Sequence, residues 1–515
     1  MARLFIIIFI TVTTVFWSSC RKDFESVPSS GNLEFSKDTV FLDTVFTNIG
    51  SSTFTLKVYN RSNDDINIPT VRLGEGQNSK YRLNVDGVAG KEFQNVEILA
   101  KDSIFIFIET TADIQDFTAN STQFLYTDSI EFDTDGNQQE VSLVTLVQDA
   151  VFLFPQRFNN GITESILLRI DDEGNEIRIE GFFLEDDELH FTNEKPYVIY
   201  GYAGVSENKV LIIDAGARVH FHENSGIIVA DGGSLKVNGL LSTDQKLMEN
   251  EVIFEGDRLE PSFKNIPGQW GTVWLTSGST DHEINYLTIK NATVGILMDH
   301  NDGNITPTLT IKNTQIYNSS NIGLWGRTAH IDAENLVIGN AGQASLYCNI
   351  GGQYNFKHCT FANYWNNGFR EFPTVIIDNF LDLGDGEVFI SDLVNADFSN
   401  SIIFGNSNIE LFLSRDDNAA FNYNFKNCLI QFDDINNQFI DNPLFNFNNT
   451  DFFQDVILNE SPDFKASFEN KFMVGENSAG NNRGDSNTAI LVPLDILGID
   501  RTTDPDIGAY QSISF

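Results

Sequence analysis

The sequence predicts an all-β protein in which an N-terminal β-sandwich is followed by a parallel β-helix, a solenoid of stacked coils. Three observations predict this fold. A short apolar phrase recurs along residues 284–430, several alternating apolar runs precede it, and helix-favouring runs of Ala, Leu and Lys are scarce. At 515 residues the chain is long enough for two or three domains.

The recurring phrase has six residues and begins at an apolar anchor. Its copies are residues 284–289, 311–316, 333–338, 356–361, 398–403 and 425–430. The anchors lie 22 to 27 residues apart, with one gap of 42, and such a period is typical of solenoids. The third and fifth positions after each anchor carry no charge and share one face of a strand. We expect them to face a core that only stacked coils can enclose.

A polar residue stands two positions after each anchor. The copies carry, in order, Tyr286, Asn313, Asn335, His358, Asn400 and Asn427. Asn tolerates unusual backbone angles and can hydrogen-bond to neighbouring coils, so we interpret this position as a ladder of bends and not as a ligand site. About 11 or 12 residues after the anchor, a small residue precedes a further strand at Gly295, Gly323, Ser345 and Gly368.

From Tyr197 onward the chain resembles the right-handed parallel β-helix repeat proteins of the pectin-lyase-like class. Residues 210–222, 226–229 and 232–239 are similar to the opening coils of that class, and residues 266–275 to its connector. The resemblance implies a right-handed solenoid over residues 197–441. We assign residues 442–515 to end coils and a cap, because an open solenoid end exposes strand edges. The repeat indicates a fold and says little about activity.

The pattern of residues 33–148, before the solenoid, predicts the β-sandwich. Its alternating runs are residues 39–46, 54–59, 66–73, 81–85, 96–99, 104–110, 124–132 and 141–147, and short strands at this spacing are typical of a β-sandwich. The phrases at residues 44–47, 58–60 and 102–106 resemble the immunoglobulin-like modules that precede β-helices in Bacteroidetes lipoproteins. A connector, residues 149–196, follows and contains a hairpin whose turn, residues 171–176, is acidic.

The N-terminus indicates the compartment. Arg3 precedes an apolar run, residues 4–17, that is too short to span a bilayer, and Ser18, Ser19 and Cys20 follow it. This pattern resembles a bacterial lipoprotein signal, which implies a signal peptide over residues 1–20 and a lipid on Cys20. A tether over residues 21–32 follows. Its charged start, residues 21–25, resembles the tag that places lipoproteins on the outer face of the outer membrane. Ordinary signal cleavage with secretion and a periplasmic face are the alternatives.

Charge and cysteines exclude several functions. The net charge of −40 and the pI of about 4.3 argue against nucleic acid as a partner, because phosphate binding is driven by Lys and Arg. An acidic solvated surface is the favoured interpretation, and a dedicated ion site is the alternative. We expect Cys348, Cys359 and Cys428 to be buried thiols, and their spacing forms no metal-binding framework.

No catalytic residue and no metal ligand is assigned. His220 and His222 lie two apart on one strand without a third ligand, so we interpret them as facing solvent. We predict no cofactor. Calcium binding at the acidic turn is the alternative, although the acidic residues of the turn are not spaced as in an EF-hand loop. Acidic doublets on strands point to opposite faces, unlike the paired carboxylates of glycosidases. The Gly-His-Gly and Arg-x-Lys motifs of the polygalacturonase branch are absent from the sequence.

Five residues are candidates for ligand binding. Arg327, after Trp325, and Arg370, after Phe369, follow strands that the spacing makes equivalent. Trp325, Tyr347 and Trp365 could supply rings for sugar stacking beside them. The alternative is that all five are corner and surface residues.

The hypothesis that follows is a non-enzymatic, lipid-anchored protein of the outer membrane that faces the cell exterior. Its β-helix side would offer a platform for a glycan or another envelope polymer. The first alternative is a polysaccharide lyase or glycosidase acting on the same face. The second is a structural or adhesive stalk.

Overall fold

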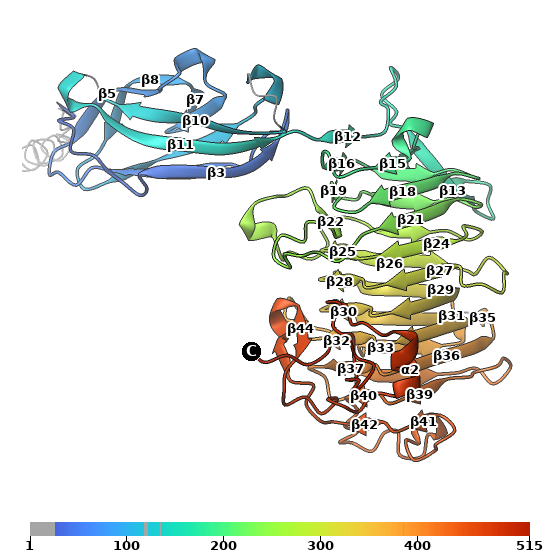
Figure 1. The fold of residues 1–515 in the computed structure, drawn as a ribbon. Helices are drawn as coiled ribbons and strands as arrows, with labels where there is room; N and C mark the ends of the chain where they lie inside the picture. The colour runs from blue at the N-terminus through green and yellow to red at the C-terminus, as the bar shows by residue number, and fades with distance from the viewer. Residues whose placement is uncertain (1–25, 118–121, 134, 385) are drawn as a thin grey trace, which may run out of the picture. The chain divides into compact units, whose positions relative to one another are not determined.

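The computed structural model describes residues 26–117, 122–133, 135–384 and 386–515. The chain divides into two compact units, residues 1–149 and 150–515, which are blue to cyan and green to red in Figure 1. The predicted signal peptide, Cys20 and the charged segment 21–25 lie outside the described residues. Among the described residues no helix has the length and apolar character needed to cross a membrane.

Unit 1 consists of two sheets around one apolar core. One sheet holds β1 (Val27–Pro28), β5 (Ile66–Leu73), β8 (Glu92–Ile98), β10 (Gln123–Phe132), β11 (Gln139–Gln148) and β3 (Thr39–Phe46). The other holds β2 (Glu34–Phe35), β4 (Phe54–Tyr59), β9 (Ser103–Thr110), β6 (Tyr81–Val85) and β7 (Val88–Gly90). All eight predicted runs overlap strands. β1, in the segment predicted as a tether, pairs with β5 and belongs to the sheet.

Unit 2 is a parallel β-helix with three faces. The first face is an 11-stranded sheet. Its strands are β12 (Val151–Leu153), β16 (Tyr197–Ile199), β19 (Arg218–Phe221), β22 (Val252–Gly256), β25 (Leu287–Lys290), β28 (Gln315–Tyr317), β30 (Val337–Gly339), β32 (Thr360–Asn363), β37 (Ile402–Gly405), β40 (Leu429–Ile430) and β42 (Ile457–Leu458).

The second and third faces form one 18-stranded sheet, because β29 (Ile322–Glu334) and β31 (Ala344–Lys357) cross the corner between them. The second face holds β14 (Glu176–Phe183), β17 (Tyr202–Val205), β20 (Gly226–Val229), β23 (Val273–Leu275), β26 (Val294–Asp299), the first halves of β29 and β31, β33 (Val375–Asp378) and β38 (Leu411–Ser414). The third face holds β15 (His190–Phe191), β18 (Val210–Asp214), β21 (Ser234–Asn238), β24 (His282–Asn285), β27 (Leu309–Lys312), the second halves of β29 and β31, β36 (Leu393–Ser399), β39 (Asn424–Lys426) and β41 (Phe453–Gln454).

The coils begin earlier than the sequence predicted. β12, β14 and β15 lie in the predicted connector, yet each pairs in parallel with a strand of the next coil. The predicted hairpin is present, since β13 (Ser165–Ile170) pairs antiparallel with β14. The first coil therefore starts at Val151, and the hairpin is an extension of it.

The anchors and their inward positions face the core, as predicted. Ile284, Ile311, Phe356 and Phe425 are buried, and so are the third and fifth positions of every phrase. Cys348, Cys359 and Cys428 are buried and free, and burial raises the pKa of Cys359 and of Cys428 to about 12. The thiols are core residues, which confirms that interpretation.

The ladder of bends is also confirmed. All six residues two positions after the anchor have φ between 45° and 53°, the left-handed region that Asn tolerates better than most residues. The Asn335 amide donates to Asn313 Oδ1 at 2.8 Å, and the Asn400 amide lies 2.9 Å from His358 Nε2. Each bend thus joins the third face to the first and bonds to the coil beside it.

Seven residues after the anchor, a second Asn row lies at the opposite edge of the first face. Asn291, Asn318 and Asn340 have φ of 62°, 55° and 56°, and Asn363 continues the row. The Asn318 amide donates to Asn291 Oδ1 at 3.3 Å. This second row was not predicted, although the Asn residues recur seven positions after the anchors in the sequence.

The small-residue corner holds in three of the four predicted coils. A Cβ on Gly295 would lie 2.5 Å from the Gly323 carbonyl oxygen, and one on Gly323 would lie 2.2 Å from an Ile338 methyl carbon. Ser345 follows in the next coil, where it is fully buried. Gly368 is wrongly placed in this series, because it lies in a loop before β33 and Phe369 beside it is 91% exposed.

Phenylalanines fill the last coil, and the C-terminal segment packs on the first face. Phe432, Phe439, Phe445 and Phe447 lie in or after the last coils and contact one another. Residues 459–515 then return along the outer side of the first face, where Phe472, Ile507 and Tyr510 pack on outward side chains of that sheet. Figure 1 shows this red segment, with β43 (Phe464–Ala466), β44 (Lys471–Val474) and α2 (Ser486–Leu491), beside the solenoid. Of the predicted end coils and cap, residues 442–515, only the part before residue 459 therefore lies at the C-terminal end of the solenoid.

The bend at Asn335 permits a stability test. Its side chain also donates to the Leu494 carbonyl oxygen and accepts from Arg501. Asn335→Ala should lower the free energy of unfolding of unit 2 by about 2–4 kcal/mol, since it adds left-handed strain and removes buried hydrogen bonds. Asn335→Gly should lose less, because it relieves the strain. Urea unfolding followed by tryptophan fluorescence measures this, since Trp270, Trp274, Trp325 and Trp365 all lie in unit 2. Equal midpoints for the two variants would refute the strain contribution.

Candidate functional site

An outward row of large apolar side chains runs along the second face. The strand register places Trp274, Leu297, Trp325, Tyr347, Ile376 and Phe412 side by side in successive coils. Five steps of about 4.8 Å give a row about 24 Å long. We call these six residues the apolar row. The rings of Trp325 and Tyr347 are parallel within 5°, with centroids 5.9 Å apart.

A polar row lies beside it, two residues further along each strand. It contains Asp299, Arg327 and Asn349 in neighbouring coils, and Asp378 in the coil after them. Asp299 forms an ion pair with Arg327 and accepts a hydrogen bond from Trp274 Nε1 at 2.7 Å. The Arg327 guanidinium also lies 5.4 Å from the centre of the Trp325 ring. Asp299 thereby fixes one ring and one cation of the two rows.

Asp378 fixes the next ring. Its carboxylate accepts from the Tyr347 hydroxyl at 2.8 Å, the Asn349 amide at 2.8 Å and the Ile350 backbone N–H at 2.9 Å. Burial raises the pKa of Asp378. Both carboxylate oxygens accept hydrogen bonds, so this acid orients Tyr347.

Two hollows lie on the second face. One, of about 310 Å³, is lined by residues of the apolar row, including Tyr347, Ile376 and Phe412, together with Asp378 and Asp382. The other, of about 430 Å³, lies between the β14 hairpin and the corner of the first coils, where Tyr202 and Thr272 line it. Val294 of the second hollow pairs with Ile322 of the first. The hollows therefore adjoin across neighbouring coils.

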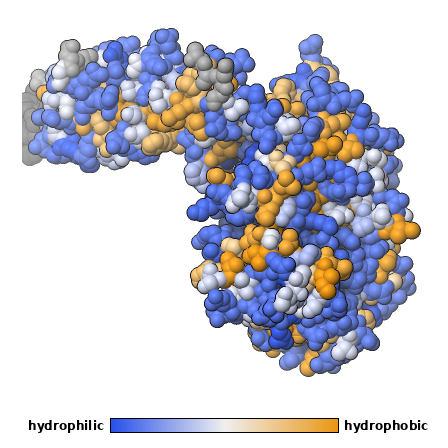
Figure 2. All heavy atoms as spheres, in the orientation of Figure 1, coloured by the Kyte–Doolittle hydropathy of each residue, from blue (hydrophilic) through white to orange (hydrophobic). Residues whose placement is uncertain are grey.

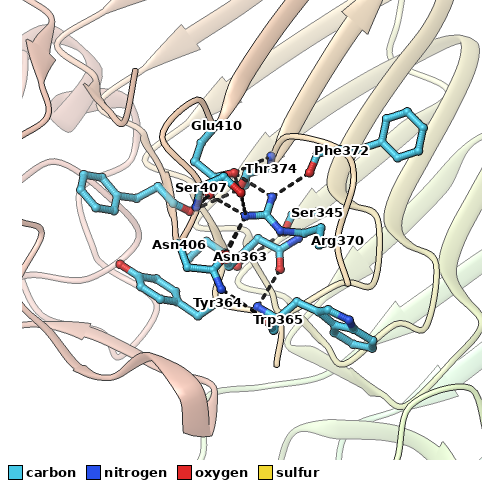
Figure 3. Close-up of polar contacts among 12 residues, drawn as sticks. Ser345, Asn363, Tyr364, Trp365, Arg370, Phe372, Thr374, Asn406, Ser407 and Glu410 are labelled. Atoms are coloured by element: carbon cyan, nitrogen blue, oxygen red, sulfur yellow. Dashed lines mark hydrogen bonds and ion pairs between the residues drawn. The ribbon is translucent and has the colours of Figure 1, made fainter. Parts of the chain in front are cut away.

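Arg370 is placed differently from the prediction. It lies in the loop before β33, and its side chain and that of Glu410 are 4% and 0% exposed. Figure 3 shows the Arg370 guanidinium against Glu410, Asn406 and Ser407. Glu410 also accepts from the backbone N–H and the hydroxyl of Thr374. This buried ion pair ties the loop to β38, so Arg370 is a positioning residue.

The five predicted ligand residues thus separate into two groups. Trp325, Arg327 and Tyr347 lie together on the second face. Trp365 is half-buried in the loop after β32, near Gly342, and is not part of the apolar row. Arg370 does not follow a strand equivalent to that of Arg327, because residues 364–374 form an inserted loop and β33 begins at Val375. A loop of this kind lengthens the coil without changing its strands.

Sequence reasoning missed Trp274, Asp299, Asp378 and Phe412. Leu297, Trp325 and Tyr347 stand two residues after the small corner residues Gly295, Gly323 and Ser345. Extending that offset to the flanking coils would have reached Trp274, Ile376 and Phe412, but the corner there is Thr272, Thr374 or Glu410. Because these three corner residues are not the small residues of the middle coils, the two-residue offset could not be recognised there from the sequence.

The predicted alternatives for metal binding are placed as follows. His220 is buried, contrary to the interpretation that it faces solvent, and burial lowers its pKa. His222 lies 2.7 Å from Asp257. In the acidic turn, the Asp171 carboxylate accepts from the Asn175 backbone N–H, which lowers the pKa of Asp171. In the described ranges, no group of three or more His, Cys, Asp or Glu side chains is arranged to hold a metal ion.

Comparison with known proteins gives distant structural matches. No protein-family model and no curated protein matches the chain. A family 123 glycoside hydrolase from Clostridium perfringens, studied for glycolipid glycan hydrolysis, matches with 10% identity and a TM-score of 0.16 over 24% of this chain and 30% of that chain. The catalytic unit of a thermostable GH87 alpha-1,3-glucanase from Streptomyces thermodiastaticus matches with 12% identity and a TM-score of 0.24 over 73% of this chain and 74% of that chain.

The chain spans about 30% of the length of the first of these two structures. With TM-scores of 0.16 and 0.24, neither similarity bears on the activity of this protein. The functional argument rests on the two rows and the hollows of the second face.

The buried ion pair makes a second prediction. Arg370→Met should lower the free energy of unfolding of unit 2 by about 3–5 kcal/mol, because it leaves Glu410 buried without its partner. The double variant Arg370→Met with Glu410→Met should be more stable than Arg370→Met alone. Urea unfolding followed by tryptophan fluorescence measures both.

The control for these Arg370 and Glu410 variants is the exposed ion pair of Arg415 and Asp417, whose side chains are 43% and 83% exposed. Arg415→Met should change stability by about 1 kcal/mol or less. A double variant that is less stable than Arg370→Met would show that the pair is not coupled as described.

Proposed function

We propose that the second face of unit 2 binds a polysaccharide chain and that the protein is a non-enzymatic, lipid-anchored protein of the cell surface. The apolar row supports this proposal most strongly. Aromatic rings offer large, rigid contact areas at low conformational-entropy cost. A row that crosses six coils suits an extended polymer better than a small molecule.

The polar row supplies the second element of the proposal. Binding sites are mainly apolar and contain a few placed polar groups that fix the orientation of the ligand. The Arg327 side chain is 32% exposed, so it can donate to ligand hydroxyl groups while Asp299 holds it. The Asn349 side chain is buried and supports Asp378. Ring contacts and one accessible cation are then available to a sugar polymer.

A neutral polysaccharide is the favoured ligand class. Asp378 and Asp382 line the hollow of about 310 Å³, and the whole protein carries a net charge of −40. Like charges repel a polyuronate at this face, although salt screens the effect beyond about 8 Å. A neutral glycan chain meets no such repulsion.

The binding proposal predicts the effect of ring truncation. Trp325→Ala and Tyr347→Ala should each weaken binding to a neutral polysaccharide by about 5- to 30-fold, because each removes about 1–2 kcal/mol of apolar contact. Affinity electrophoresis in gels containing glucan, mannan, xylan or polygalacturonate measures this. Phe41→Ala, which removes an exposed ring of unit 1, should leave binding unchanged. Retained affinity in both row variants would refute the site.

The alternative of a lyase or glycosidase is tested on the same polymers. Release of reducing ends or of unsaturated products is measured with and without calcium, using the wild-type protein. Turnover that Trp325→Ala abolishes would replace the binding role with an enzymatic one. The hydrogen bonds that occupy both oxygens of Asp378 support binding, since this acid is already committed to orienting Tyr347.

The anchoring part of the proposal rests on the lipoprotein-like signal that ends at Cys20. Cys20→Ser should abolish incorporation of an alkynyl fatty acid in a bacterial host and release the protein from the membrane fraction. Cys348→Ser, which changes a buried core thiol, is the matched control and should leave labelling intact. Labelling of the Cys20→Ser variant would contradict the anchor. Protease accessibility on intact cells then distinguishes the outer face from the periplasmic one.

A further inference from the structure

A pocket of about 530 Å³ lies on the outer side of the first face, away from the apolar row. Four of its lining residues are Lys246, Lys264, Lys290 and Lys471, and one is the acid Glu469. The whole chain has 32 Lys and Arg against 72 Asp and Glu. The pocket therefore reverses the charge balance of the protein at one place. Its volume lies in the range of ligand sites, about 300–1,000 Å³.

Three segments outside the repeated coils contribute lysines to this pocket. Lys246 comes from the loop between β21 and β22, and Lys264 from the loop between β22 and β23. Lys471 comes from the C-terminal segment that returns along the first face. Only Lys290, in β25, belongs to the repeat. Two insertions and the returning chain thus bring lysines to a common hollow.

Two of the lysines are available to a ligand. Lys290 lies 3.4 Å from Glu255, and Lys471 lies 2.5 Å from Glu469. Lys246 and Lys264 form no side-chain ion pair within the described part of the chain. An ammonium group is a compact point charge with three donors and commonly binds carboxylate, phosphate or sulfate oxygens.

The floor of the pocket adds oriented polar groups. The buried hydroxyls of Tyr317 and Tyr510 both donate to Gln315 Oε1. These two hydrogen bonds orient the Gln315 side-chain carbonyl toward the tyrosines. Its Nε2 then points toward Thr288 and lies 3.4 Å from the Thr288 hydroxyl oxygen. The amide N–H groups of Gln315 and the side chains of Asn318 and Asn470 surround the same hollow. Each of the three amide groups donates one hydrogen bond within the protein, to Thr288, Asn291 and Asn318 in turn, and its second N–H is a donor for the neutral part of a ligand.

We propose that this pocket binds a small polar molecule bearing an oxyanion. The acidic remainder of the protein disfavours such a ligand elsewhere, so the lysines make the pocket selective for it. Figure 2 shows that the face of unit 2 turned to the viewer carries both hydrophilic and hydrophobic residues. The site is separate from the polysaccharide face and does not depend on it.

Isothermal titration calorimetry on the full chain tests the pocket with sodium D-glucuronate, sodium phosphate and sodium sulfate at constant ionic strength. At least one probe should bind saturably, and Lys246→Gln with Lys264→Gln should weaken it tenfold or more. Binding of glucuronate alone assigns a carboxylated sugar, and binding of phosphate or sulfate assigns those oxyanions. No saturable binding of any probe would overturn the proposal.

Two controls separate the pocket from general charge and from the other face. Lys195→Gln with Lys465→Gln removes the same charge at exposed positions outside the pocket and should leave the affinity unchanged. An equal loss in this variant would overturn the proposal. Trp325→Ala should also bind the probe normally, so failure of the polysaccharide site and failure of this site are distinguishable. Thermal unfolding confirms that each variant is folded.

Discussion

The single-residue left-handed bend between the third and first faces is the constraint on which unit 2 depends. Six bends with φ between 45° and 53° recur at one position of the coil. Because one left-handed residue turns the chain there, the inward positions pass from the anchor to the third residue after it, one residue further than strand alternation alone would place them. The parallel register of the second-face strands keeps the apolar row aligned over six coils. The side-chain amides of Asn313 and Asn335 then hold neighbouring bends together.

The same bends hold the C-terminal segment. Asn335 Oδ1 accepts a hydrogen bond from Arg501. The Asn400 side chain donates to the Asp485 carbonyl oxygen and accepts from the Asp485 backbone N–H. His358 Nδ1 lies 3.3 Å from the Gly508 carbonyl oxygen. Arg501 is almost fully buried, and burial lowers its pKa to about 10. The returning chain thereby covers much of the first face. The second face keeps its outward rows, which is why the two proposed sites lie on different faces.

The sequence predicted what repeats and could not predict what joins distant segments. Anchors, inward pairs and Asn bends recur at fixed spacing, so the solenoid and its core followed from periodicity. Glu410 lies 40 residues after Arg370 in the chain, and only the folded coil brings the two charges together. The loop of residues 364–374 moved Phe369 out of the strand because an insertion leaves the neighbouring strands unchanged. The packing of residues 459–515 has no period at all, so its place on the first face was unpredictable.

The geometry of the apolar row restricts how a polymer can lie on it. Trp325 and Tyr347 are parallel with centroids 5.9 Å apart, so they already contact each other and leave no space for a sugar ring between them. A bound chain must lie across the outward edges of the rings and contact several coils at once. Since the coil spacing sets the ring spacing, the proposed binding implies an affinity that grows with the number of coils engaged. Long polymers should therefore bind more tightly than their short fragments.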